Sequence, residues 1–180
     1  ITNGKTSDIK VARSILFPPG SIAVMDRAYV DYKWLKVLDS KGVFFVTRIK
    51  ENTSFEIVED RRTKGRDDSI QADWNVRLTG ATAGSNYPGF LWIVTVHDER
   101  KGQDIQLLTN HLNWTAENVG ELYRSRWAIE SFFKQVKQLF RVKTFVGTTA
   151  NAVRIQLWTA LIAILLLEYL QNKAKYAWSK

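Results

Sequence analysis

Apolar residues near the start of the chain follow one helical pattern and two short continuous runs. The apolar residues of segment 8–17 recur at helical spacing, and Pro18-Pro19-Gly20 follows the segment directly. This pattern predicts a short helix that ends in a turn. The runs at 22–25 and 43–46 are continuous, so we expect two buried strands. Asp31 can cap a helix between them. This order predicts a crossover unit with two parallel strands.

The middle of the chain alternates between strand-like runs and polar turns. The strand-like runs are 55–58, 74–78, 90–96 and 105–108. Charged or glycine-containing segments separate them, which predicts a β-rich insertion. The basic segment 61–68 has two interpretations, a solvated hairpin tip and a loop that contacts nucleic acid.

Two long helical patterns follow the insertion. Thr115 can cap the first, which we expect to reach about Phe140. The second, 151–177, is apolar on most sides, and we expect it to be a buried core helix. A membrane span is the alternative, but polar and charged residues interrupt and flank the most apolar run. The element order predicts an α/β fold interrupted by a strand-rich insertion.

Composition narrows the chemistry. The 180 residues suit one domain, or one domain with an insertion. The lack of cysteine excludes disulfides, thiolate nucleophiles and zinc–thiolate sites. The two histidines, His97 and His111, argue against a multi-histidine metal site. A formal net charge of +8 indicates a polyanionic partner, most often nucleic acid.

The first of the two late helices carries a narrow polar stripe. At about 100° per residue, Arg126 and Lys134 lie about 40° on either side of Glu130. Tyr123 and Lys137 fall between them. Apolar positions border this stripe, so we expect it at the edge of the core, where a cleft would form.

The stripe has two interpretations. It can be a set of helix-stabilising ion pairs, each contributing about 0.2–0.5 kcal/mol. Ion pairing leaves a surplus of positive charge unexplained, because residues 121–154 hold seven basic residues against two acidic ones, a formal charge of +5. A basic stripe with a tyrosine is typical of a phosphate-binding surface, and the carboxylate within it suits a divalent cation.

The same residues carry a family resemblance. Tyr123, Arg126, Glu130 and Lys137 follow the spacing Y-x2-R-x3-E-x6-K, and Asp26 begins the sequence Asp-Arg-Ala-Tyr after a predicted strand. Further matches in order and spacing are segments 45–50, 108–110 and 145–153. Over nearly its whole length the chain resembles bacterial insertion-sequence transposases of the DDE type, specifically the insertion sequence four family.

The resemblance implies an RNase H-like catalytic core that cuts and joins DNA. In that family two aspartates and one glutamate hold two Mg²⁺ or Mn²⁺ ions. By position, Asp26 resembles the second aspartate and Glu130 the glutamate, and both are the expected catalytic metal ligands. The expected DNA-binding residues are Tyr123, Arg126 and Lys137 from the resemblance, and Lys134 from the stripe.

The resemblance also divides the chain into three parts. Residues 1–49 are expected to form part of the RNase H-like core, 50–112 the β-rich insertion, and 113–180 the helices that complete the core. In the family, an aromatic side chain from the insertion stacks on a flipped base. Trp74 and Trp92 are candidates for this role, and a buried core position is the alternative for each.

The family's first aspartate has no counterpart here. Asp8 begins a predicted helix, where a cap or dipole role suffices. The chain also begins at Ile1 rather than Met. We therefore expect the C-terminal portion of a transposase, without the first core strands, the first catalytic aspartate and an end-recognition domain, and inactive alone.

Three functional hypotheses remain open. The chain can derive from an active transposase, can be a catalytically inactive basic DNA-binding remnant, or can be a gene remnant that does not fold stably. The expected partner is DNA, both transposon ends and target. The full-length protein is expected to act as a homodimer in the bacterial cytoplasm, associated with the nucleoid and not with a membrane.

Overall fold

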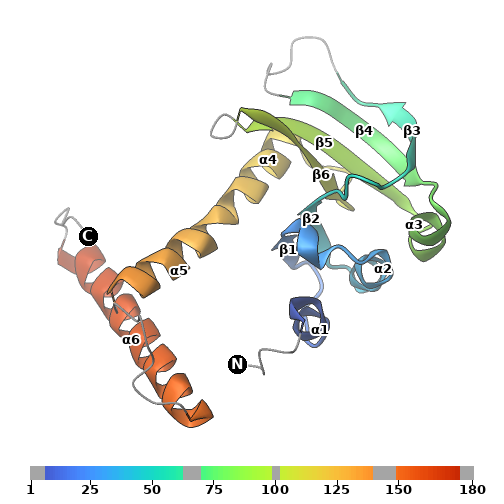
Figure 1. Ribbon diagram of the computed structural model, residues 1–180. Helices are drawn as coiled ribbons and strands as arrows, with labels where there is room; N and C mark the ends of the chain where they lie inside the picture. The colour runs from blue at the N-terminus through green and yellow to red at the C-terminus, as the bar shows by residue number, and fades with distance from the viewer. Residues whose placement is uncertain (1–6, 63–69, 99–101, 140–148, 175–180) are drawn as a thin grey trace. The chain divides into compact units, whose positions relative to one another are not determined.

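A computed structural model describes residues 7–62, 70–98, 102–139 and 149–174, with side chains described only as far as residue 134 in the third range. The chain divides into two compact units, Thr2–Arg126 and Trp127–Lys180 (Figure 1). Most of the basic segment 61–68, and part of segment 145–153, lie outside the described residues.

Within the described residues, the first unit is built on one six-stranded sheet of order β1-β2-β6-β5-β4-β3. Its strands are β1 (Ile22–Met25), β2 (Phe44–Arg48), β3 (Phe55–Asp60), β4 (Ile70–Leu78), β5 (Phe90–Asp98) and β6 (Gln103–Thr109). β1 and β2 are parallel, and the other neighbouring pairs are antiparallel. The mixed sheet with its helices confirms the expected α/β class.

The crossover between β1 and β2 is formed as predicted. A short 3-10 helix, η1 (Arg27–Tyr29), follows β1, and α2 (Tyr32–Ser40) leads back to β2. The side chain of Asp31 accepts a hydrogen bond from the backbone N–H of Trp34 and so caps α2. Gly42, with φ of 69°, takes the left-handed conformation that ends the crossover and leads into β2.

The strands of the expected insertion continue the same sheet. β6 pairs with β2 through Val46 and Thr109, so the segment 50–112 is hydrogen-bonded directly to the crossover unit. Asn110 strengthens this junction: its Oδ1 accepts from the N–H of Phe45 at 2.9 Å, and its Nδ2 donates to the carbonyl of Val43 at 3.1 Å. The three-part division of the chain stays a prediction.

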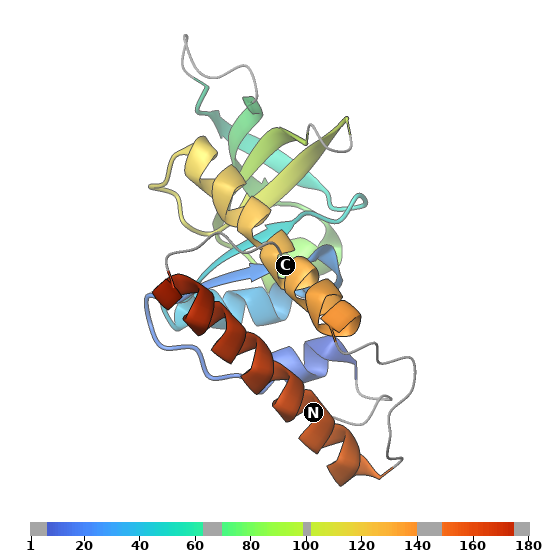
Figure 2. The same cartoon turned by 90° about the vertical axis from the view of Figure 1, so that its left-hand side faces the viewer.

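Helices cover both faces of the sheet. On one face α1 (Asp8–Arg13), α2 and α3 (Ala81–Asn86) pack over a core that includes Leu35, Phe45 and Ile93. On the other face α4 (Ala116–Ser125) packs over Val46, Trp92 and other buried side chains; it lies in front of the sheet in Figure 2. Thr115 caps α4 as predicted, because its Oγ1 accepts from the N–H of Asn118.

The helix expected to run from Thr115 to Phe140 is interrupted. The structure has two helices, α4 and α5 (Trp127–Leu139), separated by Arg126. Arg126 keeps helical angles, φ −55° and ψ −32°, but its N–H donates to the carbonyl of Tyr123, three residues back. This tighter turn breaks the regular pattern of hydrogen bonds. The prediction of a single uninterrupted helix was therefore wrong.

The last helix, α6 (Ala150–Ala174), lies where the sequence predicts it, but it is much less buried than we expected. Of its described side chains only Ala160 and Ile164 are buried, and Phe132 of α5 packs against them. Many apolar side chains of α6 are exposed, because within its unit the described residues provide only α5 as a packing partner. By length and composition alone α6 could also cross a membrane, a test that core helices of soluble proteins pass too.

Candidate functional site

Asp26 lies at the carboxyl end of β1, where the strand turns into η1. Its Oδ1 accepts a hydrogen bond from the N–H of Arg27 at 2.6 Å, which caps η1. The side chain is 46% exposed. The end of β1 therefore presents a carboxylate that one hydrogen bond holds in place and that solvent can still reach.

Arg126 reaches this carboxylate from the end of α4. Its Nη1 lies 3.7 Å from Oδ2 of Asp26, and its own side chain is only 12% exposed. The guanidinium carbon lies 5.4 Å from the ring centroid of Tyr123, close enough for a cation–π contact. Asp26, Tyr123 and Arg126, which we predicted as site residues, are thus brought together.

The docking of α4 on the sheet explains this meeting. Ala116, Val119 and Tyr123 are buried along one side of α4. At Gly120 an added Cβ would lie 3.2 Å from Cγ1 of Val96, so a glycine lets α4 approach β5 closely. The buried side fixes the helix, and its last turn then points Arg126 toward the end of β1.

Tyr123 is buried under this cluster. Burial, the largest effect, raises the pKa of its phenol, and the Asp26 carboxylate raises it further. The guanidinium groups of Arg126 and Arg48 lower the pKa and so oppose this shift. The net effect is a pKa above the ordinary value. Tyr123 therefore keeps its proton at neutral pH, which makes it a hydrogen-bond donor toward an anion.

Arg48 is a site residue that our sequence reasoning did not select. It ends β2, and the parallel register pairs Met25 with Thr47, so Asp26 and Arg48 follow at the same edge of the sheet. Thr47 Oγ1 lies 3.4 Å from the carbonyl oxygen of Asp26, which ties the two strand ends. The predicted parallel crossover already contained this signal, because residues after paired positions of parallel strands lie side by side.

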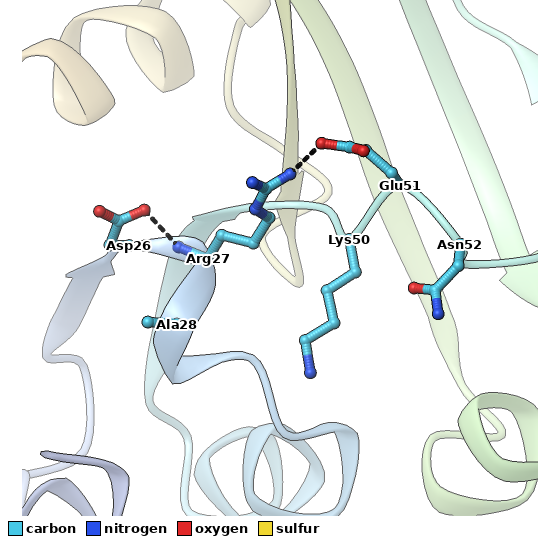
Figure 3. A pocket seen from close by; sticks show the side chains of 6 residues that line it. All are labelled: Asp26, Arg27, Ala28, Lys50, Glu51 and Asn52. Carbon is cyan, nitrogen blue, oxygen red and sulfur yellow. Dashed lines mark hydrogen bonds and ion pairs between the residues drawn. The ribbon is translucent and has the colours of Figure 1, made fainter. Parts of the chain in front are cut away.

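An open pocket of about 640 Å³ lies next to Asp26. The residues that line it come from the turn after β1 and the loop after β2, and they are Asp26, Arg27, Ala28, Lys50, Glu51 and Asn52 (Figure 3). Ligands of open α/β sheets commonly bind outside the carboxyl ends of the strands. The pocket has that position and carries charges of both signs.

Three predicted residues lie on α5, in the second unit. Glu130 and Lys134 are exposed. Lys137 lies within α5, but its side chain is outside the described residues. The prediction of one stripe on one helix does not hold as stated, because Arg126 separates α4 from α5. Tyr123 and Arg126 belong to the first unit and the other three to the second.

The carboxylates of the predicted site do not form a closed metal-binding group within the described part of the chain. Among the residues that the structure describes, no three His, Cys, Asp or Glu side chains gather in a group that could hold a metal. Asp26 and Glu130 are carboxylates with solvent-accessible positions. Such oxygens suit a hard divalent cation, which can be held by one or two carboxylates together with substrate phosphates. Each carboxylate by itself therefore fits as an oxygen ligand for such a cation.

Trp92 is a core residue in this structure. It has no exposed surface, its Nε1 donates to Oδ1 of buried Asp73 at 2.6 Å, and the guanidinium of Arg61 lies 4.3 Å from its ring. This arrangement leaves no exposed ring surface on which a base could stack, and favours the core alternative that we considered. Trp74 is half-buried beside Phe55, with ring centroids 6.5 Å apart.

Comparisons with known proteins identify the family of the chain. A sequence model of the family described as "Transposase DDE domain" matches residues 1–166. The chain is 35% identical over 170 residues to "Putative transposase y4zB" of Sinorhizobium fredii, covering 93% of the chain and 47% of that protein. It is 34% identical over 155 residues to "Probable transposase for insertion sequence element IS5377" of Geobacillus stearothermophilus, covering 86% and 40%.

A third relative, "Putative transposase for insertion sequence element IS4SA" of Synechocystis, is 26% identical over 162 residues, covering 85% of the chain and 42% of the relative. The chain thus spans less than half the length of these relatives. Proteins of the DDE transposase family generally use divalent metal ions. The family match covers most of the chain, and the chain belongs to the transposase DDE domain family.

Proposed function

We propose that the chain provides two of the catalytic carboxylates and the phosphate-binding residues of a DNA transposase of the insertion sequence four family. Its sheet is proposed to be part of an RNase H-like core. The observation that carries the proposal is the cluster at the end of β1, where a half-exposed Asp26 meets Arg126 over buried Tyr123. A strand-end carboxylate can hold a divalent cation, and a neighbouring guanidinium and phenol can bind the phosphate on which metal-assisted phosphoryl transfer acts.

In this proposal Asp26 and Glu130 hold Mg²⁺ or Mn²⁺ together with a DNA phosphate. The metal, when bound, supplies the activation of water or a 3′-hydroxyl and the stabilisation of the departing oxygen. Arg126 binds a phosphate through two parallel donors, and Tyr123 donates its phenolic proton. Lys134 and Lys137 contribute charge along the DNA backbone.

The remaining partners are proposed from the same function. The DNA bound is transposon-end and target DNA, and the full-length protein holds two ends as a homodimer in the cytoplasm, at the nucleoid. Since the chain spans less than half of its relatives, these roles belong to the whole protein.

A catalytically inactive DNA-binding remnant is the second candidate. The observation that favours it is that the resemblance provides counterparts for only two of the family's three catalytic carboxylates, Asp26 and Glu130. The two candidates share the DNA-binding surface and differ in whether the carboxylates bind metal.

DNA binding tests what both candidates share. We expect a fluorescein-labelled duplex of arbitrary sequence to bind the chain, and Lys134→Ala to lower the salt slope by about 0.9, because one cation no longer neutralises a phosphate. Affinity should fall about equally for unrelated sequences. Lys33→Ala, at an exposed position of α2, is the matched control. Equal salt slopes for both variants would remove Lys134 from the DNA surface.

An assay of Mg²⁺-dependent DNA nicking tests whether the chain alone is a complete enzyme. We expect the chain alone to leave supercoiled DNA intact, because the family resemblance supplies counterparts for only two of the three catalytic carboxylates, Asp26 and Glu130. Robust nicking that Glu130→Ala abolishes and Glu56→Gln leaves unchanged would show that the chain contains a complete centre and that the inference of a missing first aspartate is wrong.

A further inference from the structure

The pocket beside Asp26 is lined by charged residues that are not among the proposed DNA-binding residues. It lies between two short segments, 26–28 after β1 and 50–52 after β2. Because β1 and β2 are adjacent and parallel, these segments leave the sheet at the same edge. A DNA strand with a phosphate at Asp26 could therefore continue past this pocket, and the charges that line the pocket would then contact it.

Lys50 supplies a positive charge that no carboxylate of the described residues neutralises. Its side chain is exposed, and it forms no ion pair with any of the described residues. Figure 3 shows its side chain among the residues that line the pocket, with the ammonium group directed away from the ion pair of Arg27 and Glu51 and toward the side of the Asn52 amide. An ammonium group in this position can bind an anion without first giving up another partner.

Arg27 supplies a second positive charge, but it is held by Glu51. The two side chains form an ion pair across the pocket, with the Arg27 side chain 43% and the Glu51 side chain 86% exposed (Figure 3). An ion pair this exposed is weak and is screened by salt. A phosphate, which offers a guanidinium two acceptor oxygens, can therefore displace Glu51 from Arg27.

We propose that this pocket binds the DNA backbone next to the phosphate at Asp26, with Lys50 and Arg27 as the cations that bind its phosphates. Glu51 competes with that phosphate for Arg27 and so lowers the affinity for DNA. The side-chain amide of Asn52 also lines the pocket and adds a hydrogen-bond donor. This inference rests on the proposed function, because it extends the same DNA path into the pocket.

Charge-neutralising variants test the pocket through the affinity for a fluorescein-labelled DNA duplex, measured by fluorescence anisotropy over a salt series. Lys50→Ala should weaken binding and lower the salt slope by about 0.9. Glu51→Gln should tighten binding by about two- to fivefold. Glu56→Gln is the matched control, because Glu56 also forms an exposed ion pair with an arginine, Arg77, in the same sheet. It should change affinity less than Glu51→Gln does.

The Arg27→Gln background shows whether Glu51 acts through Arg27. If it does, Glu51→Gln loses most of its effect there, since the competition for the guanidinium is gone. An equal gain in both backgrounds, or a gain no larger than that of Glu56→Gln, would overturn the proposal. Circular dichroism and thermal melting confirm that each variant is folded.

Failure of the proposed function gives a different pattern. If the wild-type chain does not bind DNA, the proposed function and this inference both fall. If Lys134→Ala lowers the salt slope while Lys50→Ala and Glu51→Gln match their wild-type parent, the pocket lies off the DNA path. The proposed function then stands without it.

Discussion

Asp26 shows what a residue's neighbours in the sequence can and cannot reveal. The apolar run before it predicts a strand end, and the structure confirms that position. Its contacts with Arg126 and its proximity to Tyr123 were not derivable from spacing, because they depend on how α4 docks against the sheet. Arg48 was missed for the opposite reason: its location followed from the predicted parallel register, but we did not extend that register past the paired residues.

At the same scale, Asp31 should act mainly as a helix cap. Its Oδ1 accepts from the N–H of Trp34 at 2.8 Å, and its Oδ2 pairs with exposed Arg13. Asp31→Ala removes both interactions and should lower the free energy of unfolding by about 1 kcal/mol in urea titrations. Asp31→Asn keeps the cap acceptor and should lose less than about half of that. Equal losses would assign the effect to the Arg13 pair.

Tyr87 should make the protein sensitive to alkaline pH. Burial, and then the charge and hydrogen bond of Asp39, raise the pKa of its phenol strongly. The unfolded chain therefore releases this proton above about pH 10 while the folded protein retains it. Stability is complete below that pH and falls as the pH rises above it.

Unfolding in urea at a series of alkaline pH values measures this effect. Tyr87→Phe, which cannot ionise, should be less stable than wild type at neutral pH because it lacks the hydrogen bond to Asp39. It should also lose less stability above about pH 10. Parallel pH profiles for the two proteins would show that another group causes the decline.

Among the elements, those with strong local signals were predicted well. The strands β1 to β6 all overlap predicted runs, and the caps of α2 and α4 involve the predicted residues Asp31 and Thr115. The break between α4 and α5 was missed because no glycine or proline marks it. The strand order was also beyond the sequence pattern, since the pairing of β2 with β6 joins segments far apart in the chain.

Asn110 is expected to hold that junction of strands. It accepts from the N–H of Phe45 and donates to the carbonyl of Val43 and to Oδ1 of Asp39. Asn110→Ala leaves these groups without their partner and should lower the free energy of unfolding by about 2–4 kcal/mol. Asn113→Ala, at a nearby exposed position, should change it by less than about 0.5 kcal/mol. Similar values for both would contradict this role.

For the whole molecule, the structure shows where part of the net charge of +8 lies. It does not show a complete metal centre among the residues that it describes. Arg48 and Arg126 gather near Asp26, and Arg27 and Lys50 line the adjoining pocket. Glu130 lies in the second unit, so its partnership with Asp26 rests on the family resemblance and stays a proposal. No local pattern could establish it, because metal ligands from separate units meet only through the arrangement of the whole protein.

Mn²⁺ binding in the presence of a DNA duplex tests that partnership most directly. Isothermal titration would compare wild type, Asp26→Asn, Glu130→Gln and the double variant, with Glu56→Gln as control. If both carboxylates hold one ion, each single variant should lose nearly as much Mn²⁺ affinity as the double variant, and the control should match wild type. Independent, additive losses, or Mn²⁺ binding unchanged by either substitution, would contradict a shared metal centre.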